Sequence, residues 1–170
     1  LNWIGNGLTL PSGPLREDIS SLKFYDNVFL NGNDEHLINI KDQIKKINPT
    51  ININQGKYVP LNIKYFNKEL NYLVFSGIGN HRTFVNMLKD NNLKIVDDLE
   101  YPDHYQYSKK DFFEIINKAK KYGARIITTE KDYLRLDFFD RKEILYIKST
   151  LKILDEKKLE QTLNNLNEAN

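Results

Sequence analysis

Residues 72–80, with the sequence YLVFSGIGN, join a short apolar run to a glycine-containing turn. The run 72–75 carries no charge, and an unbroken apolar run of this kind is typical of a strand buried on both faces of a parallel sheet. Residues 82–91 follow the turn and carry apolar side chains at helical spacing. Strand, turn and helix in this order form the repeating unit of an α/β fold.

The flanking segments continue the alternation. Ser108, with Asp111 three residues later, predicts a capped helix that ends before Gly123. The other predicted elements are strands at 24–31, 93–99, 124–129 and 144–147 and a last helix that begins at Asp155. The sequence therefore predicts an α/β fold with a mostly parallel sheet and helices on both faces. In such sheets, ligand-binding loops follow the carboxyl ends of the strands.

The segment before residue 72 is harder to interpret. Residues 34–48 have apolar side chains at helical spacing but remain ambiguous, and Pro49 would end a helix there. Residues 50–66 alternate in the manner of strands, and we expect a turn near Gln55-Gly56.

Composition excludes several classes of function. The chain has 170 residues, a formal net charge of +2 and no cysteine, so disulfides, thiolate metal sites and cysteine nucleophiles are excluded. The near-neutral charge gives no electrostatic basis for binding nucleic acid. No apolar run approaches the roughly 20 residues that span a bilayer, and the first residues are not typical of a signal peptide.

Residues 10–17, LPSGPLRE, form the first candidate functional segment. Two prolines and a glycine predict a rigid turn that presents Arg16 and Glu17. This is either a solvated surface turn or a device that aims Glu17 at Mg²⁺ and Arg16 at an anion, since carboxylate oxygen is a suitable magnesium ligand.

Three further segments follow predicted strands. The turn in 75–80 is either a tight strand-to-helix connection or an anion site formed by backbone amides. In 101–105, YPDHY, His104 is either an ordinary loop histidine or a group that exchanges a proton near neutral pH, and the adjacent Asp103 need not be its partner. In 128–132, TTEKD, the alternatives are a solvated turn with a helix cap, or contact of Lys131 with substrate or phosphate.

Taken together and in order, these segments resemble the tetraacyldisaccharide 4'-kinase family of lipid A biosynthesis. The family segments GNGxxLP[AS]GPLREP, FxGIGNP, FPDHHx[YF] and TTEKDAx[KR]L are matched by residues 5–17, 75–80, 101–107 and 128–136. The departures from the family pattern leave the centre of each motif intact, and they are Asp18, His81, Tyr101, Tyr105 and Tyr133.

The resemblance implies the C-terminal part of a two-domain P-loop-type kinase. We expect residues 1–60 to be the tail of the nucleotide-binding domain plus a β linker, and 61–170 to be the C-terminal α/β domain. The family's phosphate-binding loop, the acidic residues that help bind Mg²⁺ and the aspartate proposed as general base have no counterpart in this sequence. ATP and Mg²⁺ would therefore be bound mainly by an N-terminal half.

The resemblance also implies roles for individual residues. His104 would orient or assist the aspartate that takes the proton of the sugar hydroxyl. Glu17 would help on the Mg²⁺ side, and Arg16 would hold its segment or an anionic group. Asn80 and Asp103 would fix the loops that carry them.

The implied reaction is ATP-dependent phosphorylation of the 4'-hydroxyl of a tetraacyl disaccharide 1-phosphate. The implied partners are this lipid A precursor, the membrane surface and a separately encoded N-terminal half, with a peripheral location at the cytoplasmic face of the bacterial inner membrane. Two alternatives remain open: a non-catalytic remnant or binding module of the same fold, and an unrelated α/β nucleotide-binding domain.

Overall fold

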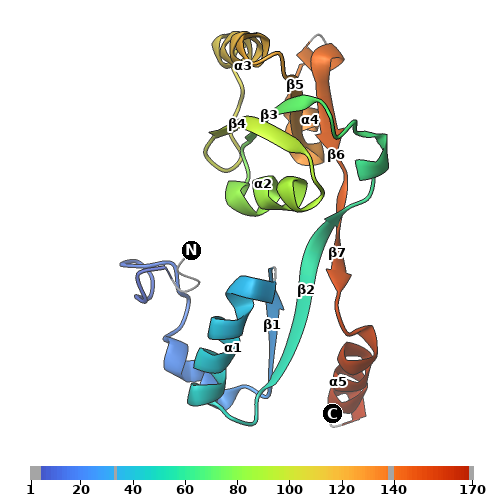
Figure 1. Ribbon diagram of the computed structural model, residues 1–170. Coiled ribbons are helices and arrows are strands. Elements are labelled where there is room, and N and C mark those ends of the chain that lie inside the picture. The colour runs from blue at the N-terminus through green and yellow to red at the C-terminus, as the bar shows by residue number, and fades with distance from the viewer. Residues whose placement is uncertain (1–4, 33, 138–139, 169–170) are drawn as a thin grey trace. The chain divides into compact units, whose positions relative to one another are not determined.

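The computed structural model describes residues 5–32, 34–137 and 140–168 (Figure 1). Two compact units divide the chain. The first comprises residues 1–57 and 151–170, and the second comprises residues 58–150. The sequence interpretation placed a boundary at residue 60 and assigned everything after it to one domain. In the structure the last 20 residues group with the first unit, because β7 (Ser149–Ile153) lies beside β2 (Asn52–Pro60).

The second unit contains a four-stranded parallel sheet with the order β4-β3-β5-β6. β3 is central, and its Val74 pairs with Asp98 on one side and Ile127 on the other. The strands are β3 (Asn71–Ser76), β4 (Lys94–Glu100), β5 (Arg125–Thr129) and β6 (Ile144–Ile147). All four strands were predicted within two residues of these bounds.

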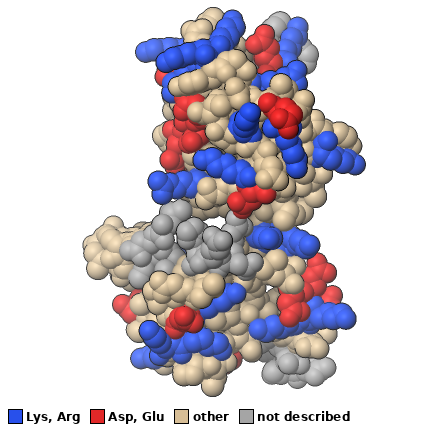
Figure 2. All heavy atoms as spheres, viewed as in Figure 1, with Lys and Arg blue, Asp and Glu red and all other residues tan. Residues whose placement is uncertain are grey.

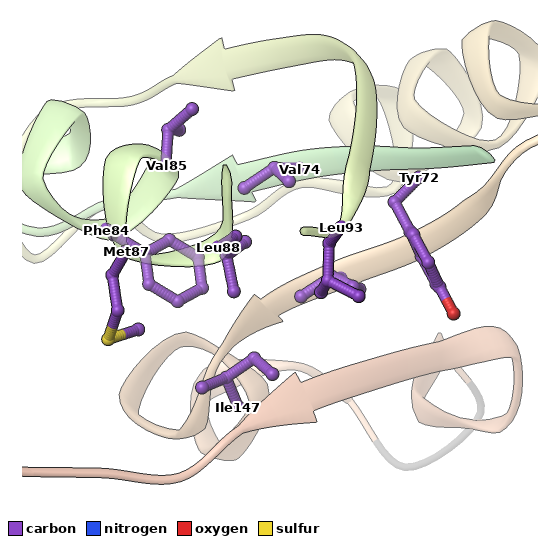
Figure 3. Close-up of a cluster of buried hydrophobic side chains, with 9 residues drawn as sticks. Tyr72, Val74, Phe84, Val85, Met87, Leu88, Leu93 and Ile147 are labelled. Carbon is purple, nitrogen blue, oxygen red and sulfur yellow. The ribbon is translucent and has the colours of Figure 1, made fainter. Parts of the chain in front are cut away.

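Helices cover both faces of this sheet because successive side chains of β3 point to opposite sides. Val74 packs against Phe84 and Leu88 of α2 (His81–Asp90), and Figure 3 shows this cluster extending to Ile147 of β6. Leu73 faces the other way, into the cluster that contains residues of α3 (Lys109–Lys121). The predicted fold class is therefore confirmed.

Local signals fix the ends of α3 as the sequence predicts. The Ser108 side chain accepts from the backbone N–H of Asp111, and the Asp111 side chain accepts from that of Ser108, which completes a capping box. Gly123 follows the helix with φ of 55°, a left-handed conformation that glycine adopts at little cost. The remaining helical elements of this unit are η2 (Ile63–Tyr65), α4 (Glu130–Arg135) and η3 (Asp140–Glu143).

The first unit is built on parallel pairing of β1 (Asn27–Asn31) with β2, followed by β7. Its core joins Leu30 to Leu37, Ile44 and Ile51. The helices are η1 (Ile19–Phe24), α1 (Asp34–Ile47) and α5 (Glu156–Glu168). The helical alternative for residues 34–48 is thus the observed one.

One sequence prediction about local structure was wrong. The chain does not turn at Gln55-Gly56, because β2 runs straight through it. Gly56 is needed for close packing, since a Cβ there would lie 2.7 Å from the Phe29 ring and 3.2 Å from Leu151. The strand predicted at 24–31 is present as β1 but begins at Asn27, because Phe24 ends η1, and β7 was not predicted. Among the described helices, none combines the length and apolar character needed to cross a membrane.

Candidate functional site

The loops that follow β3 and β4 meet at the carboxyl edge of the second unit's sheet. The backbone N–H of Tyr101 donates to the Ser76 carbonyl over 2.9 Å, and that of His104 donates to the Gly77 carbonyl over 3.1 Å. A Cβ at position 77 would lie 3.0 Å from the Pro102 carbonyl oxygen. Glycine therefore allows the two loops to approach this closely.

His104 lies at the exposed tip of this junction. Its side chain is 80% exposed, and its backbone adopts φ of 59°, an uncommon conformation for a residue other than glycine. The guanidinium of Arg135 lies 3.2 Å from Nδ1 of His104. Because arginine only donates, Nδ1 accepts this bond, and the neutral ring carries its proton on Nε2. Nε2 lies 3.9 Å from the Asp103 carboxylate and is available to donate to another group.

The fully buried carboxylate of Asp132 is paired with Arg135. Asp132 is 0% exposed and lies 3.3 Å from Nη1 of Arg135, which also donates to the Gly77 carbonyl over 3.1 Å. The hydroxyl of Thr129 donates to Asp132 over 2.6 Å, and that of Tyr107 donates over 3.1 Å. Burial and the neighbouring Asp132 carboxylate raise the pKa of Tyr107, so this phenol keeps its proton and remains a donor.

An aromatic cluster holds the loop that carries His104. The Tyr107 ring contacts Phe75 of β3 edge-on with centroids 5.2 Å apart, and Tyr101 lies 4.9 Å from Tyr105. Burial raises the pKa of Tyr101 to about 12. Because Phe75 is fully buried, the loop is anchored to the core of the unit although its tip is exposed.

Three other predicted site residues lie around this loop. The Asn80 side chain accepts from the Thr83 backbone N–H over 3.1 Å and so caps α2. The Asp103 side chain accepts from the backbone N–H of His104 over 3.0 Å. Lys131 is exposed on the first turn of α4, and no hydrogen bond or ion pair joins it to another described residue. Residues 129–132 are thus the capped start of a helix, as one alternative predicted, but Thr129 and Asp132 are buried rather than solvated.

Arg16 and Glu17 belong to the first unit, and both are exposed. Their segment closes on itself, because the N–H of Leu10 donates to the Leu15 carbonyl over 2.8 Å. Glu17 accepts from the hydroxyl of Tyr25 over 2.9 Å. That bond, together with the negative charge of Glu17, raises the pKa of Tyr25.

Two polar networks escaped prediction. The first is the Asp132–Arg135 pair, although its signal was present, since the two residues are three apart and follow a helix-capping threonine. The second joins His81 to Ser76 and Asp98: Nδ1 lies 2.7 Å from the Ser76 hydroxyl, and Nε2 lies 2.8 Å from the Asp98 carboxylate. His81 is 2% exposed, and nothing in its sequence neighbours indicates that contact with β4.

Comparison with known proteins decides the family. Residues 2–168 match the family model for LpxK, described as Tetraacyldisaccharide-1-P 4'-kinase. The chain is 72% identical over all of its 170 residues to "Tetraacyldisaccharide 4'-kinase" of Pelagibacter ubique, covering 54% of that protein. The chain belongs to the tetraacyldisaccharide 4'-kinase family. A relative of the same name from Rickettsia canadensis is 39% identical over 134 residues, which are 77% of this chain and 39% of that protein.

The fold is also that of a solved member of the tetraacyldisaccharide 4'-kinase family. A crystal structure of the "apo" form of LpxK from Aquifex aeolicus in complex with ATP matches 94% of this chain and 48% of that one, with a TM-score of 0.50 and 21% identity. The chain thus spans about half the length of the relatives that it matches.

The residues of this chain do not by themselves fit the two groups that a kinase of this family implies. No cluster of three or more carboxylate or histidine side chains that could hold a metal ion occurs in the described part of the chain. Glu17 can contribute at most one carboxylate ligand, and it already accepts the Tyr25 hydroxyl. For a nucleotide phosphate, the glycine turn of 77–80 leads into a helix whose first turn is already capped by Asn80.

Proposed function

We propose that this chain is the C-terminal half of an ATP-dependent kinase that phosphorylates the 4'-hydroxyl of a tetraacyl disaccharide 1-phosphate in lipid A biosynthesis. ATP would supply the phosphoryl group, with Mg²⁺ to neutralise its charge, and both would be held mainly by an N-terminal half. Because the acceptor is a lipid, the assembled enzyme would work as a peripheral protein at the cytoplasmic face of the bacterial inner membrane. Membership of the family and the intact His104 loop support the proposal.

His104 would act as a hydrogen-bond donor rather than as the base. The Arg135 guanidinium occupies Nδ1, so the ring offers only Nε2–H outward. That group suits contact with a carboxylate, which would then be held in position to accept the proton of the 4'-hydroxyl as its oxygen attacks. Such positioning of an acid or base contributes about 10²–10⁴-fold to a rate.

Arg135 would be a positioning residue in this scheme. It fixes the His104 tautomer and is itself held by the buried Asp132 carboxylate. For Arg16 and Glu17 of the first unit we propose the roles that the resemblance implies, Arg16 toward an anionic group and Glu17 on the Mg²⁺ side. The side chain of Lys131, which is exposed and makes no hydrogen bond or ion pair with another described residue, would contact the acceptor or its phosphate.

The single observation that carries the proposal is an exposed histidine whose Nδ1 accepts a hydrogen bond from Arg135, a partly buried arginine that is paired with the buried Asp132 carboxylate. The test is transfer of labelled phosphate from ATP to the tetraacyl disaccharide 1-phosphate. The chain is assayed alone and then mixed with a separately produced N-terminal half. We expect activity only in the mixture.

Variants assign the roles within the same assay. His104→Ala should lower kcat in the mixture by about 10²-fold or more, and His104→Gln, which keeps an N–H donor, should retain part of it. In the chain alone, the ¹⁵N shifts of the His104 ring should show protonated Nε2, and Arg135→Gln should abolish this preference. Full activity of His104→Ala would rule out the assigned role, and transfer by the chain alone would contradict the need for the other half. A folded chain inactive in both settings would favour the non-catalytic module.

A further inference from the structure

A cavity of about 650 Å³ opens in the second unit, away from the residues of the His104 network. Its walls come from the segment around η2, from the start of β5, from α4 and from the chain leading through β6. Small-molecule sites commonly have volumes of about 300–1,000 Å³. The cavity is therefore large enough for a phosphate group with a further organic group attached.

The described charged residues that line this cavity are Arg125, Arg141 and Lys142, and all three are basic. Among the described residues, no aspartate or glutamate lines the cavity, and no ion pair joins any of the three to a carboxylate. On the molecular face drawn in Figure 2, by contrast, basic and acidic side chains are interspersed. Three cations in one cavity, with no carboxylate among the described lining residues, favour an anionic ligand.

Arg141 is held in place before any ligand arrives. Its Nε donates to the Leu136 carbonyl over 2.9 Å, and its Nη2 donates to the Leu134 carbonyl over 2.8 Å. Its guanidinium carbon lies 5.4 Å from the centre of the Tyr133 ring. Of the five guanidinium N–H groups, these two bonds use two, and three remain for a ligand.

Aromatic side chains form another part of the wall. Tyr133 and Tyr146 both line the cavity, and their rings stack with centroids 4.3 Å apart and planes inclined by 31°. Asn62 fastens the opposite segment to this wall, since it donates to the Tyr146 carbonyl over 2.9 Å and accepts from the Lys148 N–H over 3.0 Å. Flat rings beside the cations provide a surface for an apolar or aromatic part of the ligand.

We propose that this cavity binds a phosphate monoester that carries an apolar or aromatic group. Arginine donors in a fixed fork match the geometry of phosphate oxygens, and lysine adds a point charge. The phosphate of a lipid headgroup shares this chemistry with the phosphate of a soluble ester, so the ligand's source is decided by the test. The proposal does not depend on the kinase function, because binding is measured without ATP.

The test uses the whole chain at low ionic strength. Phenyl phosphate, glycerol 3-phosphate and inorganic phosphate are titrated by calorimetry. Binding to phosphatidic acid vesicles, which present a phosphate monoester, and to phosphatidylcholine vesicles is measured by sedimentation. Arg125→Gln/Lys142→Gln removes two cavity cations that make no ion pair within the described residues. Lys89→Gln/Lys120→Gln is the matched control, because it removes the same charge from two exposed helix positions outside the cavity.

We expect phenyl phosphate to bind more tightly than inorganic phosphate. The cavity variant should weaken its binding by about tenfold or more for each lost cation, and the control should leave it unchanged. Binding of phosphatidic acid vesicles alone, lost in the cavity variant and kept in the control, would support the proposal and identify the source as a lipid headgroup. Absence of binding to every probe, or equal losses in both variants, would overturn it.

Discussion

His81 and His104 lie in the same unit, next to the loops at the carboxyl edge of one sheet, but their environments are opposite. His81 is buried, and both of its ring nitrogens have partners in the protein, Ser76 and Asp98. His104 is exposed, and only its inner nitrogen is bonded, to an arginine that a buried carboxylate supports. A histidine with both nitrogens engaged can hold elements together, whereas one with a free nitrogen can also act on another molecule.

The contrast between His81 and His104 depends first on the buried carboxylate of Asp132. Asp132→Ala should have the largest effect, a loss of about 3–5 kcal/mol in the free energy of unfolding, because it leaves Arg135 without its partner and removes the acceptor for Tyr107 and Thr129. Native-state hydrogen exchange of the β3 and β5 amides measures this loss within the second unit. Asp132→Asn keeps the shape of the side chain and one acceptor oxygen, and should cost less. Asp42→Ala, an exposed change on α1, serves as the control.

Equal exchange rates for Asp132→Ala and wild-type protein would show that the network carries no stability. The orientation of His104 would then need another cause, and the contrast between the two histidines would lose its physical basis.

The two histidines should separate stability from activity. His81→Ala should lower the free energy of unfolding by about 2–3 kcal/mol, because it opens a cavity and leaves the buried Ser76 hydroxyl unpaired. His104→Ala should change it by under about 0.5 kcal/mol, since the side chain is exposed. The same hydrogen-exchange experiment measures both changes.

Activity in the assembled enzyme should show the reverse order. At a temperature where both variants are folded, His104→Ala should lose phosphoryl transfer, and His81→Ala should retain most of it. If His81→Ala lost transfer while its fold was intact, the buried network would have a role beyond support, and the division between the two histidines would be wrong.

The fold was largely predictable because its strongest signals are local. Tyr72–Phe75 could only be a buried strand, and the capping box at Ser108 fixed the start of α3 before any tertiary contact was known. The turn predicted at Gln55-Gly56 was wrong, because the sequence does not distinguish a glycine needed for close packing from a turn glycine. β7 was not predicted because its residues are mostly exposed and are ordered by pairing with β2, which is distant in sequence.

The candidate site was predictable only in part. The acid and aromatic residues around His104 left an ordinary loop histidine as an alternative, and only the resemblance of residues 101–107 to the family segment implied a role for it. Asp98 and His81 are 17 residues apart and meet only because β4 pairs beside β3, so their contact could not be inferred from spacing. The Asp132–Arg135 pair could have been found, since residues three apart on a helix lie on one face.

A third carboxylate extends the comparison to an exposed setting. Asp111 accepts from the Ser108 hydroxyl and N–H and from the Tyr105 hydroxyl, and the bonds from Ser108 chiefly hold the pKa of Asp111 below its usual value. A lowered folded pKa means that this stabilisation is present above about pH 4, the unfolded value, and is lost as the pH falls through the folded one.

Ser108→Ala should lower the free energy of unfolding by about 1 kcal/mol at neutral pH and should flatten the decrease of that free energy in acid. Urea unfolding followed by circular dichroism between about pH 6 and about pH 3 measures both effects, with Asp111→Asn as the variant that cannot titrate. An acid response of Ser108→Ala as steep as that of the wild type would mean that the cap does not couple to the proton on Asp111.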